Sequence, residues 1–123
     1  KIVDGKLISS QIREKIKYFG NKLIEKTGKK PGLAVVLVGE NPASKVYVKN
    51  KIEKTNEVGF NSIEHRLAEN VSEESLLKLV NDLNNNSNVQ GNLVQLPLPK
   101  HIDSEHIHVH HLHQIIKATP CKM

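Results

Sequence analysis

The sequence predicts an α/β fold of three layers, in which a parallel sheet is flanked by helices. Helical and strand-like patterns alternate along the chain, and this alternation is typical of a parallel sheet covered by helices. Residues 33–38 form an unbroken apolar run, as expected for a parallel strand buried on both faces. With 123 residues, the chain fits one domain that can bury a substantial core.

The first element is an amphipathic helix near the N-terminus. Its apolar residues recur at spacings of three and four, which is the helical period. They are Leu7, Ile8, Ile12, Ile16, Phe19, Leu23 and Ile24. Gly28 and the pair Pro31-Gly32 then interrupt the pattern, and the apolar strand 33–38 follows.

A second helix and a second strand come next. Asn41 can cap the helix and Pro42 can open it, and we expect the helix to run to about residue 59. Residues 60–67 are predicted to form a strand with Ile63, His65 and Leu67 on one face.

A third helix and a third strand complete the pattern. The helix starts at Ser72, and two glutamates follow this residue in the first turn. Its buried face is formed by Leu76, Leu77, Val80 and Leu83. A run of asparagines ends this helix. Residues 93–96 are predicted to form the third strand, and Pro97 and Pro99 end that strand.

Composition narrows the class of protein. The net charge is +5, but only Arg13 and Arg66 are arginines, and the lysines are scattered along predicted helices. Specific nucleic-acid recognition relies on arginine, so we expect no nucleic-acid partner and interpret the lysines as solvated, or as attracting an anionic small molecule. No apolar run is long enough to span a membrane, and the N-terminus lacks a signal-peptide pattern. A lone cysteine, Cys121, suits a reducing compartment, so we expect a cytoplasmic protein.

Residues 39–51 follow the first strand, at the sheet edge where α/β proteins bind ligands. If Pro42 opens the helix, Ser44, Tyr47 and Lys51 lie on one helical face. A partly buried lysine tends towards a lowered pKa and can then serve as general acid and base. The alternative is that Tyr47 belongs to the core and Lys51 is an ordinary surface lysine.

Residues 94–99 close the third strand at the same edge and place Gln95 between apolar neighbours. A buried glutamine needs hydrogen-bond partners, and its amide can hold a lysine or the polar edge of a ligand. The alternative is a strand-end residue that faces solvent.

Taken together, these segments resemble one family, the bifunctional methylenetetrahydrofolate dehydrogenase/methenyltetrahydrofolate cyclohydrolases of the FolD type. The resemblance covers residues 1–103, which we interpret as a folate-binding catalytic domain. Its motifs, in order, are Val3-Asp4-Gly5-Lys6, residues 31–39, Asn41-Pro42-Ala43-Ser44, Tyr47-Val48-x-x-Lys51, Glu57-Val58-Gly59 and residues 94–99.

The resemblance implies an enzyme of one-carbon metabolism. It would oxidise 5,10-methylenetetrahydrofolate with NADP⁺ and hydrolyse 5,10-methenyltetrahydrofolate to 10-formyltetrahydrofolate. The implied catalytic residues are Lys51, which assists water attack and proton transfer, Gln95, which bonds to Lys51, and Tyr47, which packs on the folate rings. The implied substrate-binding residues are Ser44, Tyr47, Val48, Lys49, Asn50, Lys51, Val94, Gln95, Leu96 and Pro97.

The family's NADP-binding Rossmann domain and its Asp-Val-Asp-Gly stretch have no counterpart in these residues. We therefore assign no cofactor-binding residue and do not expect this chain alone to bind NADP. The family is homodimeric, which makes a homodimer the expectation here. The alternative function is a degenerate folate-fold fragment that acts at most as a weak binding module.

Residues 104–123 diverge from the family and form a His-rich helix or tail. His106, His110 and His113 share a helical face, a spacing able to hold Zn²⁺ or Ni²⁺. No fixed carboxylate or cysteine accompanies them, so solvated histidines are the favoured interpretation and no metal is assigned. Asn92 is also unusual, because that strand position is usually apolar in the family.

Overall fold

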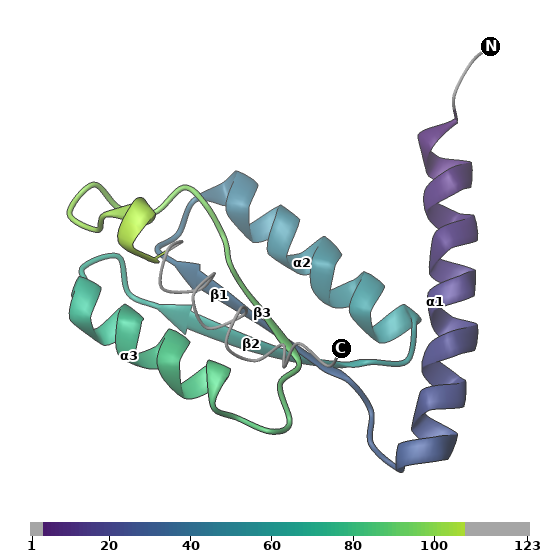
Figure 1. Ribbon diagram of the computed structural model, residues 1–123. Helices are drawn as coiled ribbons and strands as arrows, with labels where there is room; N and C mark the ends of the chain where they lie inside the picture. Colours follow the sequence, from purple (N-terminus) through teal and green to yellow (C-terminus); the bar gives the residue numbers. More distant parts are fainter. Residues whose placement is uncertain (1–3, 108–123) are drawn as a thin grey trace.

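A computed structural model describes residues 4–107 and shows the predicted alternation of helices and strands (Figure 1). The elements are α1 (Gly5–Thr27), β1 (Gly32–Val38), α2 (Pro42–Glu57), β2 (Asn61–Leu67), α3 (Glu73–Asn84) and β3 (Gly91–Val94). All six elements that we expected from the sequence are present.

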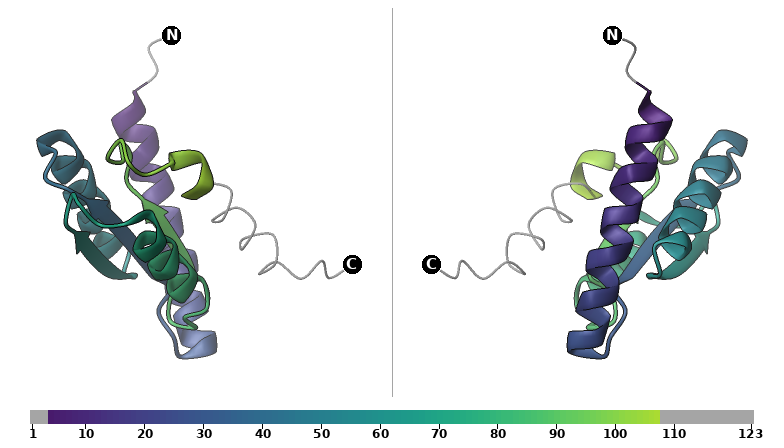
Figure 2. Two further views of the ribbon diagram at one scale, coloured as in Figure 1. Left: turned by 90° about the vertical axis from the view of Figure 1, so that its left-hand side faces the viewer. Right: turned by 90° about the vertical axis from the view of Figure 1, so that its right-hand side faces the viewer.

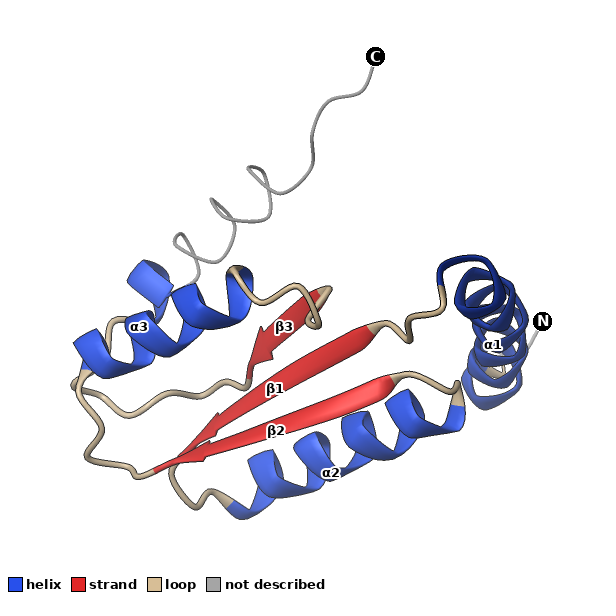
Figure 3. Ribbon diagram, turned by 90° about the horizontal axis from the view of Figure 1, so that it is seen from below, coloured by secondary structure: helices blue, strands red, loops and turns tan. Residues whose placement is uncertain are grey.

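The three strands form a parallel sheet in the order β2-β1-β3. The central strand β1 is buried almost throughout, which explains its unbroken apolar sequence. Helices α2 and α3 cover opposite faces of this sheet (Figure 3). The prediction of a parallel sheet between two layers of helices is therefore confirmed.

The alternation of side chains along β1 divides the core in two. Val35 and Leu37 point towards α2 and pack with Val48. Ala34, Val36 and Val38 point towards α3. On that side, Leu76 and Val80 are fully buried. The α3 side is the larger cluster, so it contributes most of the apolar burial that stabilises the domain.

Two helix starts follow the capping pattern read from the sequence. The Asn41 side chain accepts a hydrogen bond from the backbone N–H of Ser44 at 3.1 Å, directly before Pro42 opens α2. The Ser72 side chain accepts in the same way from the N–H of Ser75 at the start of α3. These caps satisfy N–H groups that have no partner within the helix.

The third strand differs from its predicted limits. We expected residues 93–96, but β3 spans Gly91–Val94. The backbone N–H of Gln95 still donates to the carbonyl of Val36 at 2.9 Å, and Pro97 then has no N–H with which to extend the ladder. Gln95 therefore lies one residue beyond the end of β3.

Helix α1 stands apart from the layered body, beyond the amino ends of the strands (Figures 1 and 2). Its contacts with the body include two at the middle of the helix. Gly20 is buried against Phe60, and the Arg13 Nε atom lies 3.7 Å from a carboxylate oxygen of Glu57. The apolar stripe of α1 is as regular as predicted, but its large side chains are exposed.

Within residues 4–107, no helix is both long enough and apolar enough to cross a membrane.

Candidate active site

Lys51 and Gln95 meet on the α2 face of the sheet. In β3, Leu93 pairs with Val35, so Leu93 and the residue two positions later point towards α2. That residue is Gln95. Lys51 reaches it from the third turn of α2, and its Nζ atom donates a hydrogen bond of 2.5 Å to Oε1 of Gln95. The two segments selected from the sequence are thus joined by a direct side-chain contact.

The orientation of the Gln95 amide follows from a second hydrogen bond. Its Nε2 group donates to the backbone carbonyl of Leu96 at 2.9 Å. Because Nε2 is engaged there, the amide presents its oxygen, an acceptor, to the Lys51 amine. Gln95 is therefore held at two points, by this bond and by its own N–H in the ladder with Val36.

Thr55 is a member of this region that sequence reasoning missed. It is one of two buried polar residues within residues 4–107, and its hydroxyl donates to the backbone carbonyl of Lys51 at 2.7 Å. In a helix, a threonine hydroxyl commonly donates to the backbone carbonyl four residues earlier. The spacing of Thr55 and Lys51 could therefore have indicated this bond from the sequence. The contact fixes the backbone beneath Lys51 and leaves the amine free to face Gln95.

Ser44 and Tyr47 lie on the same side of α2 as Lys51 but differ in burial. Ser44 is only 2% exposed, at the start of the helix, whereas Tyr47 is 57% exposed. The alternative that Tyr47 belongs to the core is therefore wrong. An exposed phenol beside a half-buried lysine offers a flat surface on which a ring can stack.

Three neighbouring residues that we expected to bind substrate point elsewhere. Val48 is fully buried against Val35 and Leu37. The Lys49 amine lies 3.9 Å from Glu53 on the outer surface of α2, and Asn50 is exposed beside it. Among residues 4–107, no hydrogen bond or ion pair joins these three side chains to Lys51 or Gln95.

The expected substrate-binding residues at the end of β3, and directly after it, also lie in different surroundings. Val94 pairs with Val36 and packs into the cluster on the α3 side, away from Lys51. Leu96 is 57% exposed, and Pro97 is exposed next to it. Of this segment, Gln95 alone has a described contact with Lys51.

The acidic side chain that precedes α2 is paired with a lysine. Glu40 forms an ion pair with Lys45. The hydrogen bond from Lys45, with the positive charges of Lys45 and Arg66, lowers the pKa of the Glu40 carboxyl. Glu40 thus remains a carboxylate at neutral pH at the edge where β1 enters α2.

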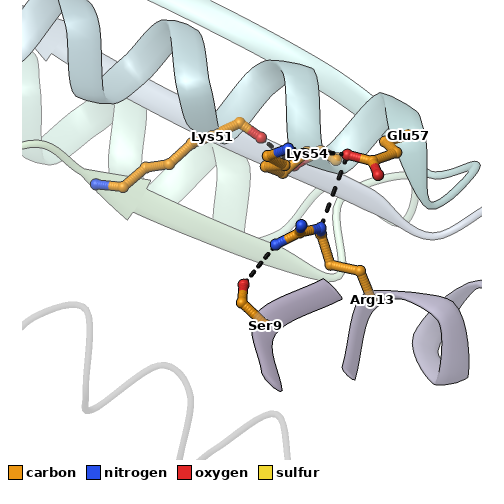
Figure 4. Close-up of polar contacts among 6 residues, drawn as sticks. Ser9, Arg13, Lys51, Lys54 and Glu57 are labelled. Atoms are coloured by element: carbon orange, nitrogen blue, oxygen red, sulfur yellow. Dashed lines mark hydrogen bonds and ion pairs between the residues drawn. The ribbon is translucent and has the colours of Figure 1, made fainter. Parts of the chain in front are cut away.

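Lys51 and Gln95 are both half-buried. Two hollows of about 440 Å³ and 430 Å³ lie at α1, and neither is lined by Lys51, Tyr47 or Gln95. In Figure 4 the Lys51 side chain points away from the group formed by Ser9, Arg13 and Glu57. Lys51 and Gln95 therefore lie apart from these two hollows.

Of the three histidines considered for a metal, His110 and His113 lie outside the described residues. The His106 Nδ1 atom is 3.7 Å from Glu73 and 3.6 Å from Asp103. Among residues 4–107, no group of three or more His, Cys, Asp or Glu side chains is placed to hold a metal ion.

Comparison with known proteins gives a consistent result. The family described as tetrahydrofolate dehydrogenase/cyclohydrolase, catalytic domain, matches residues 3–112. The bifunctional protein FolD of Listeria innocua is 51% identical over 107 residues, and that of Brucella anthropi is 50% identical over 104. These alignments cover 87% and 85% of this chain but only 37% and 35% of the relatives, so the chain spans about a third of their length.

Solved structures show the same relationship. The bifunctional FolD enzyme of Campylobacter jejuni matches with a TM-score of 0.83 at 44% identity, over 88% of this chain and 38% of that one. The FolD enzyme of Trypanosoma brucei, solved with NADP cofactor and inhibitor, matches with a TM-score of 0.85 at 29% identity, over 89% and 37%.

Proposed function

Because the chain belongs to the tetrahydrofolate dehydrogenase/cyclohydrolase family, in its catalytic domain, we propose that it supplies the folate-binding wall of that enzyme's active site. The enzyme oxidises 5,10-methylenetetrahydrofolate with NADP⁺ and hydrolyses 5,10-methenyltetrahydrofolate to 10-formyltetrahydrofolate. It would act in cytoplasmic one-carbon metabolism. The 2.5 Å hydrogen bond between Lys51 and Gln95 is the observation that carries the proposal.

The proposed chemistry of the hydrolysis depends on the Lys51 amine. Water adds to the electrophilic methenyl carbon and loses one proton, which gives a neutral carbinolamine. One carbon–nitrogen bond of this adduct then breaks as that nitrogen gains a proton and the hydroxyl group loses its proton to become the formyl carbonyl, so that one proton is released overall. Lys51, beside the substrate, would accept and return the proton. Gln95 would orient the amine through its acceptor oxygen, and the exposed Tyr47 ring would stack on the folate. Tetrahydrofolate derivatives are the proposed ligands, and a homodimer remains a prediction.

The described residues do not fit NADP. A dinucleotide-binding turn carries several glycines between a strand and a helix, so that backbone N–H groups can approach the pyrophosphate. The turn after β1 has the single glycine Gly39, followed by Glu40, whose carboxylate would repel a phosphate. The N–H of Ser44 is already bonded to Asn41. We therefore derive no hydride-transfer step from these residues.

A second candidate is a folate-binding fragment without turnover. The exposure of the α2 face favours it, because Tyr47 and Leu96 are each 57% exposed. Such a surface can bind a flat ligand on one side but cannot exclude water from it.

A paired assay separates the two candidates. Hydrolysis of 5,10-methenyltetrahydrofolate is followed by its absorbance, with the wild-type chain, Lys51→Met and the surface control Lys49→Met. The proposal predicts that Lys51→Met lowers the rate about 100-fold or more, the usual contribution of a positioned acid–base group, while Lys49→Met leaves it unchanged.

Equal rates for wild type and Lys51→Met would remove Lys51 from the mechanism. Binding of the substrate is measured separately by NMR, with Tyr47→Ala as the variant. Binding that depends on Tyr47, without hydrolysis above background, identifies the second candidate. The absence of both activities overturns both.

A further inference from the structure

Thr55 is a buried polar side chain that lies one helical turn after Lys51. It is 7% exposed, and its hydroxyl donates to the backbone carbonyl of Lys51 at 2.7 Å. The amine of Lys51 and its backbone oxygen point in opposite directions (Figure 4). Thr55 therefore contacts Lys51 at the end opposite to the amine that meets Gln95.

The backbone of Thr55 is itself fixed, because it belongs to the cap that ends α2. Its carbonyl accepts from the N–H of Phe60 at 3.1 Å, and the N–H of Gly59 donates to the carbonyl of Asn56 at 3.0 Å. Gly59 has a φ of +84°, which glycine adopts without strain. These two bonds around a left-handed glycine form a Schellman motif, which satisfies carbonyls at the end of a helix. Thr55 is thus a fixed point from which Lys51 can be held.

The hydroxyl bond adds a constraint that a regular helix lacks. In a regular helix the carbonyl of Lys51 accepts only from the backbone N–H four residues later. The hydroxyl of Thr55 supplies a second donor to the same oxygen, and such a bond influences the local bend of a helix. A change in that bend moves the side chains of this turn relative to the sheet on which α2 packs.

The contact between Lys51 and Gln95 is sensitive to such a movement. These residues are 44 positions apart and belong to separate segments, so the chain itself does not keep them within hydrogen-bond distance. Gln95 is held by its bonds to Val36 and Leu96, so the position of α2 decides whether the amine reaches it. A catalytic group has to be held within about 0.5 Å of its productive position.

We propose that Thr55 is a positioning residue for the hydrolysis: the bond from its hydroxyl to the Lys51 carbonyl holds the Lys51 amine against Gln95. The effect on the reaction rests on the proposed function. The effect on the contact between Lys51 and Gln95 does not, because that contact can be measured without substrate.

Two variants of Thr55 separate the hydroxyl from the packing of the side chain. Thr55→Val keeps the branched shape and removes the hydroxyl, and the Lys51 carbonyl keeps its helical N–H partner. Thr55→Ser keeps the hydroxyl and removes a buried methyl group, which costs apolar contact. If Thr55 only stabilised α2, the rate would follow the stability measured in urea. A positioning role predicts instead that the valine variant is slow and that the serine variant is not.

The rate is measured as the hydrolysis of 5,10-methenyltetrahydrofolate over a range of substrate concentrations. We expect Thr55→Val to lower kcat about 10-fold with little change in KM, because stacking on Tyr47 is kept and only the placement of the amine is lost. Thr55→Ser should restore kcat to near the wild-type value. Ile52→Val is the control, since it removes a methyl group from the packing of α2 and keeps the Thr55 hydroxyl, and it should leave kcat unchanged.

The contact is followed without substrate through the NMR signals of the Gln95 side-chain amide. These signals respond to the hydrogen bond that the amide oxygen accepts from Lys51. Lys51→Met removes the donor and gives the chemical shifts of the broken contact. Thr55→Val should move the amide signals from the wild-type values towards those of Lys51→Met, whereas Thr55→Ser should not.

Three outcomes overturn the positioning role. The first is a Thr55→Val variant with wild-type kcat and wild-type Gln95 signals. The second is a serine variant as slow as the valine variant, because the methyl group would then be the cause. The third is a slow valine variant whose Gln95 signals do not move, because the effect would not act through the contact with Lys51.

Failure of the proposed function has a different signature. A wild-type chain that hydrolyses no substrate, but whose Gln95 signals move in Thr55→Val and stay in Thr55→Ser, refutes the hydrolysis. The same result supports the role of Thr55 in holding Lys51 against Gln95.

Discussion

Replacing Asn92 by valine should stabilise the domain. Asn92 lies in β3 opposite Ala34 and points towards α3, on the more extensively packed face of the sheet. Its Nδ2 group donates to Oδ1 of Asn84 at 2.7 Å. Its own Oδ1 is buried without a hydrogen-bond partner, and so is Nδ2 of Asn84. The side-chain amides of Asn92 and Asn84 thus share one hydrogen bond, and each keeps one buried polar atom without a partner.

The magnitude follows from these contacts. A buried polar atom without a partner costs about 1–3 kcal/mol, and the single hydrogen bond returns about 0.5–1.5 kcal/mol. Valine removes the unpaired oxygen, forfeits the hydrogen bond, and adds apolar contact and strand propensity. Asn84 is only partly buried and can turn towards water. The net gain is about 1–2 kcal/mol in the free energy of unfolding.

Urea unfolding followed by circular dichroism at fixed pH measures this gain as a higher midpoint at unchanged slope. Asn92→Asp is the control of matched shape. It places a charge in the same position and should destabilise the domain, because the charge cannot be solvated there. A valine variant that is as stable as the wild type, or less stable, would refute the view that Asn92 is a polar group buried at a net cost.

Three further predictions concern the backbone and the charged surface. Asn41→Ala should lower the free energy of unfolding by about 1 kcal/mol in urea titrations, because α2 loses its N-cap, whereas Asn41→Ser should restore most of it. Gly32→Ala should destabilise by about 2 kcal/mol or more in the same assay, because its Cβ would lie 2.1 Å from the backbone oxygen of Asn88. An unchanged midpoint would show that this segment can move aside. The hydrogen bond from Lys54 lowers the pKa of Glu57 below its usual 4.5. Its stabilising contribution is therefore present above that value and is lost as the pH falls through the lowered pKa, so Glu57→Gln should flatten the stability profile in that acidic range. An identical profile for both proteins would contradict this linkage.

The elements of the fold were predictable because their signals are local. Asn41 followed by Pro42 determines where α2 begins, since a capping side chain and a residue without an N–H both suit the first turn. The unbroken apolar run of β1 indicated burial on both faces, and α2 and α3 cover those faces. The end of β3 was predicted two residues late, because apolar residues continue on either side of Gln95 as far as Leu96, beyond the end of the strand.

The candidate site was predictable only in part. Helical spacing placed Ser44, Tyr47 and Lys51 on one side of α2, but spacing does not show which of them is covered, and Ser44 and Tyr47 have opposite exposures. The family resemblance implied the contact between Lys51 and Gln95. Spacing alone could not, because these residues are 44 positions apart and meet only through the register of β3.

By itself, the sequence determined the six elements, the parallel sheet and the residues worth testing, because propensity, capping and periodicity act over a few neighbouring residues. The tertiary structure decided which side chains meet and which are covered. Helix α1 shows the difference most clearly: its periodic apolar residues predict a helix with an apolar face, yet that face is exposed. Periodicity reports that a helix has a surface to bury, whereas burial depends on what the rest of the fold brings against it.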